Sequence, residues 1–104
     1  MPPRGGDPSH ALEMARGLKG HVHAVNVTDG SRAVMRMSSL AVARLLLDEG
    51  IEPVLQMACR DRNRIAIQAD LLGAHALGIR NLLCLTGDPV RAGDQPKARP
   101  VNEL

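Results

Sequence analysis

The sequence predicts an α/β protein with a parallel sheet, and three observations lead to this fold class. Short, mainly apolar runs lie at about 22–27, 54–58 and 80–85, and helical patterns separate them. The starts of these runs are roughly 30 residues apart, as in successive βα units of a barrel. An open doubly wound sheet and an arc of a barrel both give this pattern. Because a closed (β/α)₈ barrel needs about 250 residues and the chain has 104, it cannot form a closed barrel by itself.

The first helix and the first strand lie before residue 28. The helix is predicted to begin at Ser9 and to end before Gly20. Its apolar face consists of Ala11, Leu12, Ala15 and Leu18. The strand follows at about 22–27, and the polar sequence TDGS at 28–31 ends it.

The second helix is predicted to begin after Ser38 or Ser39 and to end at Gly50, which suits a left-handed C-cap. Proline donates no backbone hydrogen bond, so Pro53 can open a strand but cannot lie in its middle. The second strand is therefore expected at about 54–58.

The third helix is the longest and is predicted at about 63–77, with Gly78 after it. We expect its inner side to consist of Ile65, Gln68, Leu72 and Leu77. The third strand follows at about 80–85. Beyond Pro89 the chain is polar and rich in proline, and no further element is predicted.

Composition narrows the classes of partner. The chain has no Phe, Tyr or Trp and a formal charge of only +2, so we expect no nucleic-acid partner that needs stacked bases or a strongly basic surface. No apolar run approaches the ~20 residues that span a bilayer, so we expect a cytoplasmic protein without a membrane partner. Cys59 and Cys84 lie in apolar runs and are predicted to be buried free thiols. The four histidines lack ligand spacing, and no metal site is expected.

The predicted strands all end in polar residues. Ligands of parallel α/β sheets bind at the carboxyl ends of the strands, and these ends carry the sequences at 28–31, 59–64 and 86–88. Each taken singly is also what an ordinary turn or helix cap requires. Three polar ends on one rim favour a binding site.

Gly87 and Asp88 have two interpretations each. Gly87 allows an unusual backbone conformation or the close approach of a flat ligand. The carboxylate of Asp88 can stabilise a developing cation, or it can form a local turn before Pro89.

The arginines of CRDRNR at 59–64 also have two interpretations. Arginines at a helix N-terminus oppose the helix dipole, which fits an anionic ligand. In the alternative, they are solvated and Asp61 or Asn63 caps the helix.

Three segments resemble the methylenetetrahydrofolate reductase family: PPRGGDP at 2–8, VNVTDGSRAVMRMSSLA at 25–41, and CRDRNRIAIQADLLGAHALGIRNLLCLTGDP at 59–89. The likeness is nearest to the bacterial reductase module fused to homocysteine S-methyltransferase. It implies that residues 1–104 are a partial copy of an FAD-binding TIM (β/α)₈ barrel domain, about strands 2 to 4 with their helices. The implied reaction is reduction of 5,10-methylenetetrahydrofolate to 5-methyltetrahydrofolate with NADH or NADPH, in one-carbon metabolism and methionine biosynthesis.

The resemblance also implies the site. The residues expected beside the flavin are Thr28, Gln56, Leu85, Thr86, Gly87 and Asp88. Other family members have histidine in place of Gln56 and often arginine in place of Thr86. Asp88 is the implied catalytic residue, because a carboxylate favours the iminium cation that the folate forms only after its ring opens.

Parts of the family pattern have no counterpart here. The family's general acid is a glutamate just before Pro-Pro-Arg, whereas Met1 precedes Pro2 here, and the tail at 99–104 departs from the pattern. We therefore expect a fragment that acts as an oligomer or with a complementing half-barrel. One alternative is a non-catalytic truncated remnant or assembly module. Another is a protein that binds a different phosphorylated or pterin-like ligand through Arg60, Arg62 and Arg64.

Overall fold

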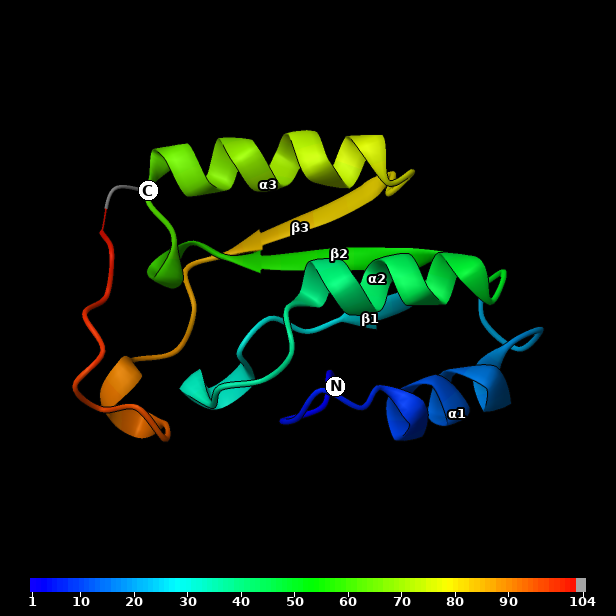
Figure 1. Cartoon of the computed structure of the whole chain (residues 1–104), viewed down its shortest axis with the longest axis horizontal. Coiled ribbons are helices and arrows are strands. Elements are labelled where there is room, and N and C mark those ends of the chain that lie inside the picture. Colours follow the sequence, from blue (N-terminus) through cyan, green and yellow to red (C-terminus); the bar gives the residue numbers. More distant parts are fainter. Residues whose placement is uncertain (103–104) are drawn as a thin grey trace.

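The computed structural model describes residues 1–102 and contains one parallel sheet (Figure 1). Its strands, in sheet order, are β1 (Val25–Val27), β2 (Pro53–Ala58) and β3 (Asn81–Leu85). The helices are α1 (Ser9–Leu18), α2 (Ser39–Asp48) and α3 (Arg64–Ala76). The predicted α/β class is confirmed. Glu103 and Leu104, at the end of the divergent tail, lie outside the described residues.

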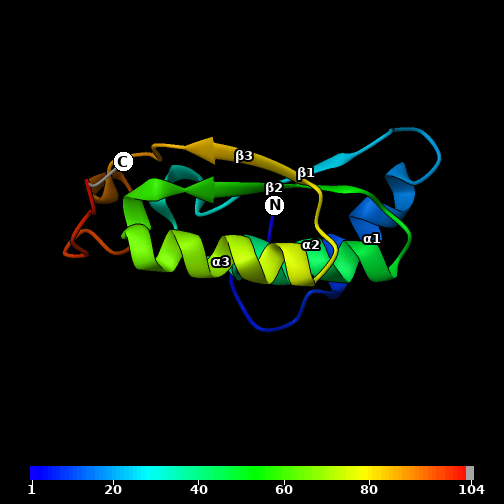
Figure 2. The ribbon, with the colours of Figure 1, turned by 90° about the horizontal axis from the view of Figure 1, so that it is seen from above.

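The helices cover only one face of the sheet. Figure 2 shows α2 and α3 on the same side of the strands, with α1 beside α2. A doubly wound sheet carries helices on both faces, whereas a barrel carries them only on its outside. The arrangement is therefore that of a barrel arc, and the assignment to barrel strands 2 to 4 stays a prediction.

The strand register determines which side chains face the helices. Val25 lies opposite Pro53, and Val54 lies opposite Asn81, so neighbours in the sheet share a face. Leu55, in the middle of β2, is buried against the helices together with the other residues of its parity. The side chains of opposite parity form what we call the open face.

The core lies between the sheet and its helices, with α2 at its centre and contributions from α1 and α3. Its buried members are Ala15, Val27, Val42, Ala43, Leu46, Ile51, Leu55, Met57, Ile67, Ala74 and Ile79. Because the chain has no aromatic residues, these aliphatic side chains supply the buried area on which the fold depends.

Most helix ends lie where the capping residues and glycines of the sequence predict them. The side chains of Ser38 and Asn63 each accept a hydrogen bond from the backbone N–H three residues later, at 3.3 and 2.9 Å. Gly50 and Gly78 follow the helices with φ of 74° and 84°, in the left-handed region. Of the two predicted caps for α3, Asn63 is the one that forms.

The prediction of a first strand at 22–27 was too long. Val22 forms only an isolated bridge with Lys19, and β1 begins at Val25, where it meets the start of β2. A short 3₁₀ helix at Val90–Ala92 was not predicted.

The prediction for the inner side of α3 was wrong. Ile65, Gln68, Leu72 and Leu77 are all exposed, with Ile65 at 78% and Leu72 at 74%. Ile67 and Ala74 point inward instead, and the half-buried Asp70 lies between them on the same side. The large apolar residues do not mark the inner side of α3, because that side also contains the small Ala74 and the carboxylate of Asp70, which pairs with Arg62.

The third strand is less buried than its composition suggests. All five of its residues are exposed, because β3 is an edge strand within the described part of the chain. Cys84 is exposed and Cys59 half-buried, and both are free thiols. The prediction of buried thiols was therefore wrong for Cys84.

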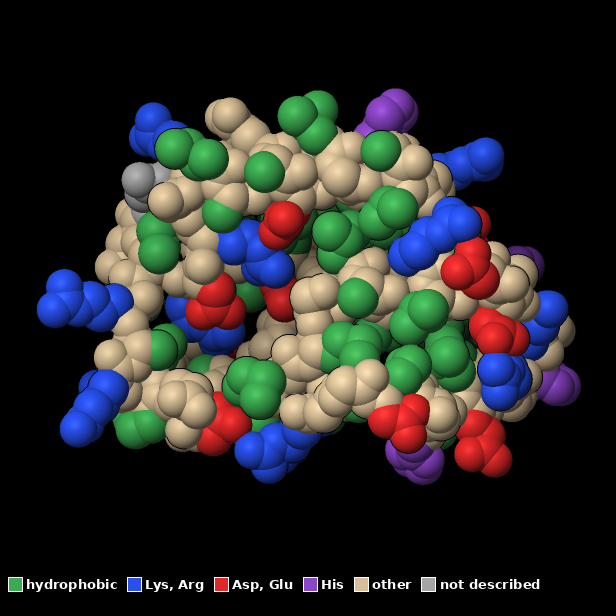
Figure 3. Space-filling model, in the orientation of Figure 1, with side chains coloured by type: hydrophobic (Ala, Val, Ile, Leu, Met, Phe, Trp, Pro, Cys, Tyr) green, Lys and Arg blue, Asp and Glu red, His purple; other side chains and the backbone are tan. Residues whose placement is uncertain are grey.

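Two surface properties bear on partners. Figure 3 shows acidic and basic side chains intermixed over the helix-covered face, so this face presents no large area of one charge. None of the helices within residues 1–102 is long and apolar enough to cross a membrane.

We expect Leu46→Ala to lower the free energy of unfolding by about 2–5 kcal/mol, because the side chain is 2% exposed in the core. Leu72→Ala is the matched control, since this helical leucine is 74% exposed and should change stability by no more than about 0.5 kcal/mol. Urea unfolding followed by circular dichroism measures both. Equal losses would contradict the assignment of the core to α2.

Candidate functional site at the carboxyl ends of the strands

The site residues implied by the family resemblance lie together. One hollow of about 300 Å³ is present at the carboxyl ends of the strands. Its lining residues are Thr28, Asp29, Gly30, Ser31, Gln56, Leu85, Thr86, Gly87 and Asp88. All six residues expected beside a flavin are among them, and the loop after β1 supplies the other three.

Strand alternation explains why these side chains meet. Gln56 lies on the open face of β2, and Leu85 pairs with Ala58, two residues further along β2. Thr28 directly follows Val27, whose side chain is buried against the helices. Because successive side chains along a strand point to opposite faces, the side chain of Thr28 points away from the helices. Thr28, Gln56 and Leu85 therefore project from one face.

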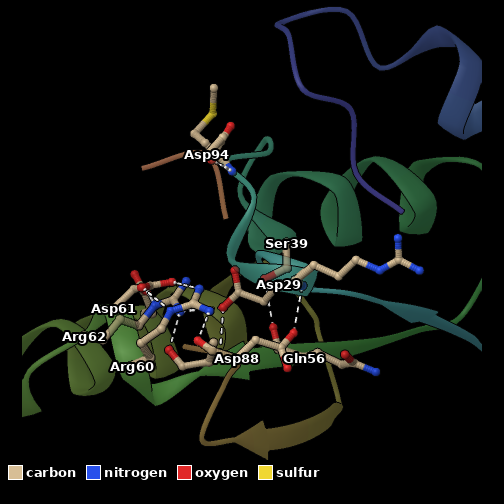
Figure 4. Close-up of polar contacts among 12 residues, drawn as sticks. Asp29, Ser39, Gln56, Arg60, Asp61, Arg62, Asp88 and Asp94 are labelled. Atoms are coloured by element: carbon tan, nitrogen blue, oxygen red, sulfur yellow. Dashed lines mark hydrogen bonds and ion pairs between the residues drawn. The ribbon is translucent and has the colours of Figure 1, made fainter. Parts of the chain in front are cut away.

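Two buried hydroxyl groups lie at the wall formed by β1 and β2, one without a partner in the described part of the chain and one hydrogen-bonded. The hydroxyl of Thr28 is buried and has no hydrogen-bond partner within residues 1–102. The buried hydroxyl of Ser39 donates to the backbone oxygen of Gln56 at 2.9 Å and so attaches the start of α2 to β2 (Figure 4). The backbone of Gln56 is thus fixed by a bond that leaves its side chain uninvolved.

Asp88 reaches across the hollow to the loop after β1. Its Oδ2 accepts a hydrogen bond from the backbone N–H of Arg32 at 2.8 Å. Arg32 and Ala33 have φ of 60° and 57°, in a region that costs non-glycine residues roughly 1–2 kcal/mol each. The carboxylate therefore helps to hold a strained loop on the rim of the site. The alternative interpretation of Asp88 as a residue of a local turn does not describe this contact.

Arg60 lies beneath the strand ends with its side chain 8% exposed. Its backbone N–H donates to Thr86 O at 3.1 Å, and its Nη1 donates to Asp88 O at 2.9 Å. Its Nε and Nη2 bind the two carboxylate oxygens of Asp61 at 2.6 and 2.5 Å. The hydrogen bond and charge of Asp61 raise the pKa of the Arg60 guanidinium above its ordinary value.

The buried Arg60 explains two of the glycines. A Cβ on Gly87 would lie 3.2 Å from Arg60 Cβ, and a Cβ on Gly30 would lie 2.9 Å from Arg60 Nη2. Both glycines also have positive φ, 95° at Gly87 and 58° at Gly30. The expectation that Gly87 adopts an unusual backbone conformation is confirmed.

Arg62 joins the first two strands. Its guanidinium binds Asp29 and Asp70 and also donates to Ala58 O at 2.9 Å. The Asp29 carboxylate in turn accepts the backbone N–H of Ala58 at 2.7 Å. Burial acts to lower the pKa of Arg62, but the hydrogen bonds and charges of Asp29 and Asp70 together outweigh it and raise the pKa.

The pairing of Arg60 and Arg62 argues against one alternative. That alternative is a phosphorylated or pterin-like ligand bound through Arg60, Arg62 and Arg64. The guanidiniums of Arg60 and Arg62 instead bind carboxylates of the chain itself (Figure 4). The geometry thus favours a scaffold role for these two side chains over contact with a phosphate.

Sequence reasoning missed three contributors to the site: Asp29, Ser39 and Arg60 in its buried position. From the sequence, Asp29 is predicted only as part of a polar strand end and Arg60 only as a candidate contact to an anionic ligand. Two features of the sequence indicate these contributors: the alternation of charge in CRDRNR at 59–64, and the glycines at the ends of the first and third predicted strands, at 28–31 and 86–88. Within residues 1–102, no group of three or more His, Cys, Asp or Glu side chains is placed to hold a metal ion.

Comparison with known proteins supports the family resemblance found in the sequence. A family model described as methylenetetrahydrofolate reductase matches residues 1–104, the whole chain. No solved structure gives a significant match.

We expect Gly87→Ala to destabilise the chain by at least about 1–2 kcal/mol, the cost of a left-handed alanine, because the new methyl group also meets Arg60. Gly17→Ala is the matched control: this glycine lies in α1 with nothing within 4 Å of the added Cβ, and the change should be neutral or stabilise by up to about 1 kcal/mol. Thermal unfolding of both variants decides the matter. A Gly87→Ala protein as stable as the Gly17→Ala protein would contradict this account of the strand end.

Proposed function

Because the chain belongs to the methylenetetrahydrofolate reductase family, we propose that it takes part in FAD-dependent reduction of 5,10-methylenetetrahydrofolate to 5-methyltetrahydrofolate. NADH or NADPH is the proposed electron donor. The observation that carries the proposal is that Thr28, Gln56 and the Leu85–Asp88 segment line one hollow. This is the place where α/β barrels bind their ligands.

The lining of the hollow fits the ring system of a flavin. Its volume of about 300 Å³ is at the lower end of the range for small-molecule pockets, which suits a ring rather than an entire dinucleotide. Leu85 supplies an apolar side chain, and the exposed Gly87 contributes backbone to the lining. The buried Thr28 hydroxyl, which has no partner within residues 1–102, is suited to a hydrogen bond with the ring edge. Thr28, Gln56 and Leu85–Asp88 are the residues that we propose hold the cofactor.

A bound flavin supplies hydride transfer, taking the hydride from the nicotinamide and giving it to the folate. The contribution of the chain is electrostatic. Asp88 is exposed on the rim with its Oδ2 held by Arg32 N–H, which keeps a negative charge at a defined position. That charge favours the iminium cation of the folate over the neutral closed ring, so it assists the step in which the cation forms.

We also propose that the active unit contains more than these strands. The outer edges of β1 and β3 pair with no strand within residues 1–102, and Leu83 and Leu85 are exposed on the open face. An edge strand with apolar side chains is a surface on which further strands assemble. A complementing half-barrel or other copies of the chain would cover it.

The same exposed edges favour a second candidate function, that of a non-catalytic assembly module. The two candidates differ in flavin binding. Purified chain is mixed with FAD, with and without a complementing half-barrel, and quenching of flavin fluorescence is measured. Uptake in either mixture supports the reductase proposal, whereas no uptake in both supports the assembly module.

We expect Asp88→Asn to retain flavin binding and to slow folate reduction by roughly 10²–10³-fold, the usual effect of removing one electrostatic contact to a transition state. Asp48→Asn is the control, because Asp48 is an exposed residue on α2 paired with Arg44 outside the hollow. Flavin fluorescence reports binding, and absorbance during flavin reoxidation by the folate reports the reaction. Equal losses of binding and reaction in the Asp88 variant would overturn the role given to its carboxylate.

A further inference from the structure

We infer that Arg60 is a positioning residue for Asp88. It holds the end of β3 so that the Asp88 carboxylate stays on the rim of the hollow and against the loop after β1. The inference has a geometric half, that Arg60 holds Asp88 in place, and a functional half, that folate reduction depends on this. Only the functional half rests on the proposed function of Asp88.

Arg60 contacts the end of β3 at two points on either side of Gly87. Its backbone N–H binds Thr86 O, and its guanidinium binds Asp88 O. β3 ends at Leu85, so these two bonds continue the attachment of the chain to β2 beyond the last strand pair. The backbone of Asp88 is therefore held from beneath by Arg60.

Asp61 orients the guanidinium for this task. Two nitrogens of Arg60 are used by the two carboxylate oxygens of Asp61, and Nη1 is directed to Asp88 O. A planar, two-pronged contact of this kind fixes orientation in a way that a lysine ammonium does not reproduce. The side chain is also nearly inaccessible, so it acts on a ligand only through its neighbours.

The remaining contact of Asp88 is insufficient by itself. Its carboxylate accepts Arg32 N–H, but Arg32 and Ala33 are in the left-handed region. A strained loop persists only where its surroundings hold it. Since Gly30 and Gly87 both lie against Arg60, this one side chain supports the loop after β1 and the end of β3 together.

Arg60→Gln tests the geometric half on the chain without cofactor, by hydrogen exchange of the Arg32 amide measured by NMR. We expect exchange of this amide to become roughly tenfold faster or more, as loss of a charge-assisted hydrogen bond implies, while core amides such as that of Leu55 change less. Arg16→Gln is the matched control, because Arg16 makes the same two-pronged contact with Glu49 outside the hollow. It should leave the Arg32 amide unchanged.

Asp61→Asn is a second variant in case Arg60→Gln does not fold. Asp61 is exposed, so asparagine fits at this position and its amide oxygen still accepts one hydrogen bond from the Arg60 guanidinium, while the two-pronged contact that orients the guanidinium is lost. An Arg32 amide that exchanges as in the unmodified chain, or no faster than the core amides, would overturn the inference in either variant.

The functional half is tested by flavin binding and folate reduction. Arg60→Gln should keep flavin affinity and slow folate reduction, and it should slow it no further when Asp88 is already asparagine. Fully additive losses would show that Arg60 does not act through Asp88. If the unmodified chain takes up no flavin, alone or with the complementing half-barrel, the proposed function fails, whereas the exchange measurement still decides the role of Arg60 in the fold.

Discussion

The constraint on which the site depends is the burial of two guanidinium groups beneath the ends of three strands. Arg60 and Arg62 follow β2, the central strand, and so reach both neighbours. Leaving one partner of a buried ion pair without the other costs about 3–5 kcal/mol, so each arginine requires its carboxylates in place. The positions of Asp29, Asp61 and Asp70 follow from that requirement.

The shape of the hollow is a consequence of the same burial. Gly30 and Gly87 leave room for the Arg60 side chain and take up left-handed backbone conformations that other residues resist. The loop after β1 then folds over the rim, where Arg32 N–H meets the Asp88 carboxylate. Asp88 therefore belongs both to the scaffold and to the proposed reaction site. Its backbone oxygen accepts a hydrogen bond from Arg60, and its carboxylate, the proposed catalytic group, accepts one from Arg32 N–H.

The two faces of the sheet have different tasks. The helix-covered face holds the aliphatic core centred on Leu55, which supplies most of the stability of a chain without aromatic residues. The open face carries Gln56, Leu83 and Leu85, is not covered by a helix within residues 1–102, and forms part of the hollow that we propose binds the ligand. The chain belongs to the methylenetetrahydrofolate reductase family, and the proposed site lies at the carboxyl ends of the strands, where (β/α)₈ barrels in general bind ligands.

The sequence predicted the order of elements, the parallel sheet and the polar strand ends, because these follow from the periodicity of apolar residues and from the turn and cap residues between the apolar runs. It left two candidates for the start of α2 and two for the cap of α3, and the structure selected Ser38 and Asn63. Tertiary structure alone decided which side of α3 is buried, how exposed β3 is, and what the arginines bind. Asp29 and Arg62 are 33 residues apart, and Arg32 and Asp88 are 56 apart. Their contacts exist only once parallel strands bring their carboxyl ends to one edge, and no local pattern records which distant carboxylate will balance a buried charge.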